Sequence, residues 1–259
     1  MTQPLAAEVT AYFGAVADRV TDVLGQQLVG LYTTGSLALG DYHPGRSDID
    51  LAAVASGRVG LGKRRELAQL LDHEVLHCPA AGLEFVLYSL ATVRAVTGRG
   101  GYLLNLNTGA DLTPLVSLDP QGQPAFWYVI DRDVARQSGR ALVGPPSDQI
   151  FVQASYQRLM SAVMASVQVH QEQLEAHLLD NTVHNACRSL AFGDTARWYA
   201  KLAGAERMLP TVGVFGQLVR AAMTSFQAGR SNSAELPPAE IDAFLDMVLG
   251  RLTNHMPRR

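Results

Sequence analysis

The sequence predicts an α/β domain with a small mixed sheet, followed by an all-α helical bundle domain. In the first half, short apolar runs with strand character alternate with segments of helical spacing. Gly144-Pro145-Pro146 then interrupts the pattern, and strand signals nearly vanish after residue 149. We therefore place one domain over residues 1–146 and a helical domain over residues 147–259.

The first domain is expected to open with a helix, because apolar residues recur at helical spacing from Leu5 to Val23 and Gly25 follows. The remaining elements expected there, in chain order, are strands over 28–33 and 48–55, a helix over 62–71, a strand over 83–88 and a helix over 131–142. In the second domain, helical spacing covers the segments 150–179, 182–192, 194–204, 211–228 and 238–253.

The composition is that of an ordinary globular protein, with 47% hydrophobic residues and a formal net charge of −3. The longest basic run is Lys63-Arg64-Arg65, which argues against nucleic acid as a partner. Two cysteines are too few for a disulfide framework. We therefore expect a cytoplasmic protein, and we expect a monomer. No signal peptide is expected, because acidic residues stand where its apolar block would be, and no membrane partner is expected, because no apolar segment approaches the length of a membrane span.

Two aspartates stand in the second predicted strand. Residues i and i+2 of a strand point to the same side, so Asp48 and Asp50 project together while Ile49 and Leu51 enter the core. Two carboxylates this close repel each other unless a cation lies between them, and Mg²⁺ takes oxygen ligands while leaving positions for phosphates. The structural alternative is that Asp48 caps the strand and Asp50 pairs with an arginine.

A third acid, Glu84, lies inside the apolar run of the third strand and shares a face with Val86 and Tyr88. A glutamate is uncommon in a central strand. If the two strands are neighbours, Glu84 completes a metal site of three carboxylates. The alternative is an exposed position on an edge strand.

The Gly35-Ser36 turn, the following loop, Ser47-Asp48-Ile49-Asp50 and the later Glu84 together resemble the DNA polymerase β-like nucleotidyltransferase superfamily. The resemblance implies that Gly35, Ser36 and Ser47 hold the triphosphate of ATP. It also implies that Asp48 and Asp50 bind Mg²⁺, and that Glu84 ligates metal or accepts the proton of the acceptor.

Within this superfamily, a domain of this kind followed by a helical half resembles the aminoglycoside adenylyltransferases that modify streptomycin and spectinomycin. Leu83-Glu84-Phe85 is similar to that family's catalytic segment, and the segment 180–188 is similar to part of its helical domain. The resemblance implies a small antibiotic as substrate, bound between the domains. The residues implied in the helical domain are Asp180 and His184 or Asn185 for the drug, and Arg188 and Lys201 for ATP.

The sequence departs from this family in its aromatic residues. Family members that act on streptomycin carry two stacking tryptophans, and the matching regions here, 104–109 and 175–177, contain none. Streptomycin is long and carries two guanidinium groups, so its site benefits from flat aromatic surfaces. Spectinomycin is compact, and we expect it to be the better substrate.

One further motif competes with this interpretation. His73-Glu74-Val75-Leu76-His77 matches the H-E-x-x-H pattern of zinc proteases. Pro79 follows almost at once, which leaves too little helix for such a site.

Three functional hypotheses follow from the sequence. The first is transfer of AMP from ATP to a hydroxyl of an aminoglycoside-like antibiotic, with release of pyrophosphate. The second keeps the chemistry but uses a protein or another metabolite as acceptor. The third, a nucleotide-binding protein without turnover, is disfavoured because a binding module has no need of a proton acceptor such as Glu84.

Overall fold

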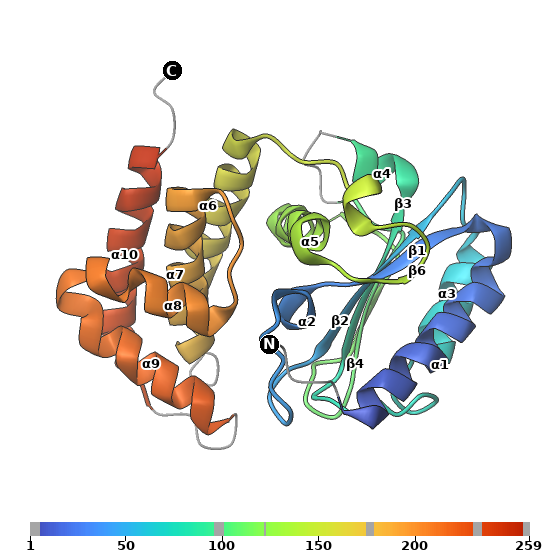
Figure 1. Ribbon diagram of the computed structural model, residues 1–259, viewed down its shortest axis with the longest axis horizontal. Coiled ribbons are helices and arrows are strands. Elements are labelled where there is room, and N and C mark those ends of the chain that lie inside the picture. Colours follow the sequence, from blue (N-terminus) through green and yellow to red (C-terminus); the bar gives the residue numbers. More distant parts are fainter. Residues whose placement is uncertain (1–5, 96–100, 122, 175–178, 230–234, 256–259) are drawn as a thin grey trace. The chain divides into compact units, whose positions relative to one another are not determined.

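The computed structural model describes residues 6–95, 101–121, 123–174, 179–229 and 235–255. The chain forms two compact units, residues 1–154 and 155–259. The first contains a mixed sheet with helices, and the described part of the second contains helices and no strand (Figure 1). This confirms the predicted fold class.

The units divide after Ala154 rather than after residue 146. Residues 147–151 stay with the first unit because they pack there. The Ser147 hydroxyl donates a hydrogen bond of 2.8 Å to the Gly139 carbonyl. The buried Phe151 ring meets the Tyr32 ring edge to face at 5.3 Å.

The sheet of the first unit has six strands in the order β5-β4-β3-β2-β1-β6. β2 and β3 pair in parallel, and the other neighbours pair antiparallel. The strands are β1 (Leu28–Thr33), β2 (Ile49–Ala55), β3 (Leu83–Ser89), β4 (Leu104–Thr108), β5 (Leu115–Ser117) and β6 (Ala141–Val143). The three strands that carry the predicted motifs are therefore the central ones.

Helices cover both faces of the sheet (Figure 1). Each face has its own hydrophobic core. On one face, α1 (Ala7–Leu24) and α3 (Leu61–Leu70) cover residues such as Leu51 and Phe85, which are 0% exposed. On the other face, α5 (Ala125–Ser138) and α4 (Leu90–Arg94) cover Ala52 and Tyr88. The short helix α2 (Gly35–Leu39) follows β1 on this second side (Figure 1).

The first unit differs from the prediction at its sheet edges. The helix expected over 131–142 spans 125–138 instead, and Ala141–Val143 form edge strand β6. Strands β4 and β5 were not expected either. These strands adopt their conformation because they pair with residues distant in the sequence. Beside β6, for example, the Thr33 amide donates a hydrogen bond of 3.0 Å to the Arg140 carbonyl.

The second unit is a bundle in which α7 is the most deeply buried helix. It contacts each of the other four long helices. The helices are α6 (Tyr156–Glu172), α7 (Leu179–Thr195), α8 (Lys201–Met208), α9 (Gly216–Ala228) and α10 (Pro238–His255). Four of the predicted segments overlap α6, α7, α9 and α10 with shifted bounds. The fifth, 194–204, is wrong for its middle part, because residues 196–200 connect α7 to α8 without helical structure. The predicted stretch 175–178 lies outside the described residues.

Single turns of 3₁₀-helix occupy residues 25–27, 147–149, 209–211 and 213–215. Among the described helices, none has the length and apolar character needed to cross a membrane.

Leu87→Ala should destabilise the first unit, because Leu87 is 0% exposed at the centre of β3. We expect the free energy of unfolding to fall by about 2–5 kcal/mol, from lost burial and the cavity that remains. Chemical denaturation checks this. Val116→Ala is the control, because Val116 is 56% exposed on edge strand β5 and should change stability little; equal losses in both variants would contradict the assignment of the core.

Candidate active site

A row of polar residues crosses the central strands of the sheet. Asp50 on β2 stands opposite Glu84 on β3, and Glu84 stands opposite Asn107 on β4. On the β1 side, the Thr34 amide donates to the Asp50 carbonyl at 3.0 Å. On the other side, Asn107 stands opposite Leu115 of edge strand β5, where the polar row ends.

All three side chains of this row, those of Asp50, Glu84 and Asn107, lie on the face that α5 covers. The residues two positions further into each strand show this. Ala52 and Val86 belong to the core beneath α5, and the Asn105 amide donates to the Tyr128 hydroxyl of that helix at 3.0 Å. Because residues i and i+2 share a face, the row lies at the open end of this core.

Gly35 leaves the space that the Asp50 carboxylate occupies. A Cβ at position 35 would stand 2.0 Å from Asp50 Oδ2, and the backbone there has φ +53°. Both features require glycine. The Gly-Ser turn and the aspartate are thus fitted to each other, which the sequence pattern suggested but could not demonstrate.

The two predicted serines of this region lie in different surroundings. The Ser36 hydroxyl is buried and has no hydrogen-bond partner among the described residues. A buried hydroxyl without a partner is costly, so it suits a position that a ligand completes. The Ser47 hydroxyl instead accepts a hydrogen bond of 3.0 Å from the His43 amide and so closes the loop before β2.

The carboxylates offer Mg²⁺ an open set of donors rather than a closed cage. Within the described residues, no three His, Cys, Asp or Glu side chains are grouped so that they could hold a metal ion. Asp50 and Glu84 are nonetheless adjacent on parallel strands, and Asp48 lies two positions before Asp50. Mg²⁺ is commonly bound by one or two carboxylates with phosphates and water completing the shell, so such a donor set suits a metal that arrives with a nucleotide.

The H-E-x-x-H segment does not form a zinc site. Turns and bends, not a helix, cover His73–His77. The His73 Nδ1 atom accepts a hydrogen bond of 3.2 Å from the Cys78 amide. A metal-bound histidine normally donates from its second nitrogen, so this contact opposes metal binding.

Comparison with known families decides what this arrangement represents. Residues 18–85 match the family model described as a nucleotidyltransferase domain. The matched span contains the Gly35–Ser36 turn and both aspartates, and it ends directly after Glu84. Over residues 18–85, the chain is therefore similar to nucleotidyltransferase domains.

The likeness of fold extends beyond that domain. A crystal structure of spectinomycin adenyltransferase AAD(9) from Enterococcus faecialis, with ATP and spectinomycin, superposes with a TM-score of 0.69. The alignment covers 95% of this chain and 99% of the other, at 14% sequence identity. At this identity the likeness concerns the fold. No curated protein matches the chain.

In the helical unit that follows the nucleotidyltransferase domain, the predicted residues form a local network. The Asp180 carboxylate accepts hydrogen bonds from the Asn181 amide at 2.7 Å and the Ser225 hydroxyl at 3.1 Å. The Lys201 ammonium donates to the Asn181 side chain at 3.0 Å and lies 5.5 Å from the Phe226 ring centre. Arg188 donates to the Asn185 side chain at 3.5 Å. Their ligand contacts remain predictions.

His184 holds helices together instead of facing outward. It is 0% exposed, and its Nδ1 and Nε2 atoms each lie 3.2 Å from a backbone carbonyl, of Lys201 and Ala222 respectively. Of the two polar neighbours offered by the sequence for drug binding, His184 is therefore engaged within the bundle. Asn185, which is partly exposed, keeps the predicted role.

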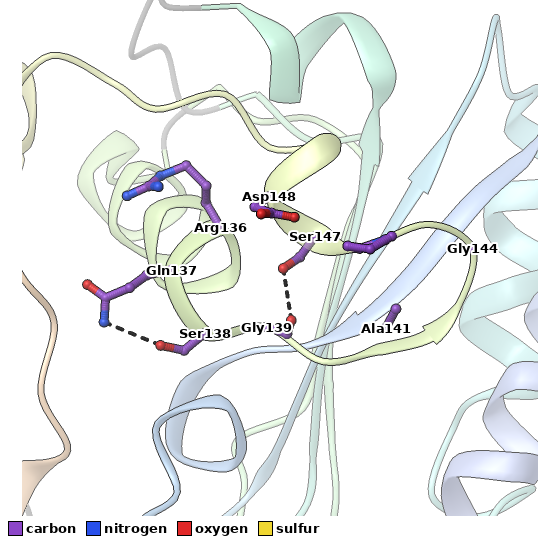
Figure 2. A pocket seen from close by; sticks show the side chains of 9 residues that line it. Arg136, Gln137, Ser138, Gly139, Ala141, Gly144, Ser147 and Asp148 are labelled. Carbon is purple, nitrogen blue, oxygen red and sulfur yellow. Dashed lines mark hydrogen bonds between the residues drawn. The ribbon is translucent and has the colours of Figure 1, made fainter.

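A cavity of about 510 Å³ lies on the nucleotidyltransferase unit, between the end of α5 and the segment after β6 (Figure 2). Arg136, Ser138 and Asp148 are among its lining residues. Two further lining residues are joined by the hydrogen bond from the Ser147 hydroxyl to the Gly139 carbonyl. Gly139 also packs on the Thr33 carbonyl, at the end of β1. None of the predicted site residues lines this cavity.

Gly35→Ala should disrupt the site, because the added methyl group collides with Asp50. We expect binding of Mg²⁺–ATP to weaken at least about tenfold, as the carboxylate is displaced, measured by calorimetry. Gly57→Ala is the matched control: its backbone has φ +66° but nothing lies within 4 Å of an added Cβ. It should cost about 1–2 kcal/mol of stability from backbone strain and leave nucleotide affinity unchanged; equal affinities in the two variants would refute the fit of Gly35 to Asp50.

The pH dependence of stability should depend on His184. Burial lowers its pKa below 6.5, although the Ala222 and Lys201 carbonyls oppose this shift. The unfolded chain therefore takes up the proton more readily, and stability is lost as the pH falls from about 7.5 to about 5.5. Urea titrations across this range should show a smaller loss in His184→Gln than in the wild type. An equal slope in both proteins would contradict the prediction.

Proposed function

We propose that the protein transfers AMP from ATP to a hydroxyl group of an aminoglycoside-like antibiotic and releases pyrophosphate. The observation that carries this proposal is the pairing of Asp50 with Glu84 beside the Gly35 turn, within a span that matches a nucleotidyltransferase domain. A nucleotide-binding protein without turnover would need no such second carboxylate opposite the first.

The proposed chemistry assigns separate roles to the acids. Glu84 accepts the proton of the acceptor hydroxyl. The hydroxyl oxygen then forms a bond to the α-phosphorus, and the bond from that phosphorus to the pyrophosphate oxygen breaks. Asp48 and Asp50, with Glu84 in part, would hold Mg²⁺, which when bound neutralises phosphate charge. The buried Ser36 hydroxyl is suited to donate to a phosphate oxygen.

The choice of acceptor class rests on the fold and on the helical unit. The fold resembles that of a spectinomycin adenyltransferase across 95% of the chain. In the helical unit, Asp180 is the proposed carboxylate for a cationic, hydroxyl-rich molecule, although it is 3% exposed and accepts a hydrogen bond from Ser225. The partly exposed Asn185 is the proposed amide. Arg188 and Lys201 remain the cations proposed for phosphate. A protein or another metabolite with a free hydroxyl is the second candidate acceptor, since the row on the sheet serves any hydroxyl.

The same reasoning favours spectinomycin over streptomycin. The first region that lacks the stacking tryptophan, 104–109, consists of strand β4 (Leu104–Thr108) and the following Gly109. A Cβ at position 109 would stand 2.3 Å from the Gly82 backbone, so this position has no room for a ring. The second region, 175–177, lies outside the described residues.

The decisive assay incubates the protein with ATP, Mg²⁺ and a panel of aminoglycosides, and uses mass spectrometry to detect the gain of one AMP group. A modified antibiotic supports the first candidate acceptor. AMP found on a protein or metabolite, with every antibiotic unmodified, supports the second. No transfer to any hydroxyl would contradict the proposed reaction.

Glu84→Gln should abolish transfer and leave Mg²⁺–ATP binding largely intact, because the amide keeps the shape but cannot accept a proton. Asp50→Asn should instead weaken Mg²⁺–ATP binding itself. Turnover and calorimetry on both variants separate these effects. Near wild-type turnover of Glu84→Gln would remove Glu84 from the role of base.

Expression in a sensitive bacterium should raise resistance to spectinomycin more than resistance to streptomycin. The physical reason is the missing aromatic surface for the longer, doubly guanidinylated drug. A Glu84→Gln strain is the control and should be as sensitive as cells without the protein. Resistance to streptomycin alone would overturn the preference.

A further inference from the structure

Asn107 is a polar residue on the row that the proposed mechanism leaves without a role. It stands directly opposite Glu84 and shares its face of the sheet. Directly opposed residues on antiparallel strands have Cβ atoms about 4.5–5.5 Å apart, within reach of one bound molecule. Asn107 is partly exposed, whereas Asn105, on the same face of β4, is buried and bonded to Tyr128.

The position of Asn107 in the polar row determines which groups lie near it. Reading across the sheet, the Gly35–Ser36 turn and Asp50 come first, Glu84 second and Asn107 third. The nucleotide and its metal belong at the first position under the proposed function. The acceptor hydroxyl must reach Glu84, so the rest of the acceptor extends on the side of Glu84 away from Asp50. That side is where Asn107 lies.

The amide is chemically suited to that place. It carries both a hydrogen-bond donor and an acceptor, which matches hydroxyl groups, and it adds no charge beside the carboxylates. Beyond it the row meets Leu115 on the edge strand, so Asn107 is the last hydrogen-bonding side chain on this path.

We infer that Asn107 contacts the acceptor and helps to select it, through a hydrogen bond from its side-chain amide to a hydroxyl of the substrate beside the one that reacts. This inference rests on the proposed transfer reaction. The ligand class is a polyhydroxylated molecule. The residue lies outside the span 18–85, so the match to the nucleotidyltransferase domain does not include it.

Asn107→Ala tests the inference in full-length protein, with the acceptor that the wild type modifies. The KM for that acceptor should rise about 3- to 10-fold, as expected for one lost neutral hydrogen bond, with kcat changed less than about twofold. The affinity for Mg²⁺–ATP, measured by calorimetry without acceptor, should be unchanged. Asn105→Ala is the matched control, since it loses a structural hydrogen bond and should lower thermal stability without raising the KM.

The alternatives give different results. A lower kcat with an unchanged KM would mean that Asn107 only orients Glu84, and would overturn the inference. Wild-type kinetics of Asn107→Ala would also overturn it while leaving the transfer reaction established. Absence of transfer in the wild type would instead count against the proposed function, and the inference would fall with it.

Discussion

The parallel register of β2 and β3 is the constraint on which the site depends. It places Asp50 opposite Glu84 while Leu51 stands opposite Phe85 on the other face. A shift of one residue would turn every side chain of one strand to the opposite face, which would put a carboxylate into a core where Leu51 and Phe85 are 0% exposed. The hydrophobic core beneath α1 and α3 therefore holds the carboxylates in position from the opposite face of the sheet.

The face of the sheet beneath α5 carries the unfavourable interactions that this register creates. Two neighbouring carboxylates repel each other, and the space for one of them exists only because position 35 lacks a side chain. The Ser36 hydroxyl beside them is buried without a partner among the described residues. Such departures from the local rules of stability are expected where residues are arranged for a ligand rather than for the fold.

The parts of the structure that the sequence predicted are those governed by local pattern. The bounds expected for β1, β2 and β3 agree with the structure to within one residue, because each strand is an apolar run bounded by turn residues. Strands β4, β5 and β6 were not predicted, because their conformation depends on partners far along the chain. β4 carried a signal, the alternation Leu104-Asn105-Leu106-Asn107, which indicates a strand with one polar face. Spacing alone could not reveal that His184 is buried among three helices, because helix contacts depend on tertiary packing.

The residues of the polar row belong to parts of the chain that are held in place by different contacts. The span that matches the nucleotidyltransferase domain ends directly after Glu84, so it contains the turn and the carboxylates but neither β4 nor the helical unit. Changes on β4 leave the β2–β3 register intact, because that register is held by core residues of the two strands themselves. A protein of this architecture can therefore alter the polar residues next to Glu84 while it keeps the groups proposed to bind nucleotide and metal. Under the proposed function, acceptor choice would be set at the outer side of the row, and the chemistry of transfer at its inner side.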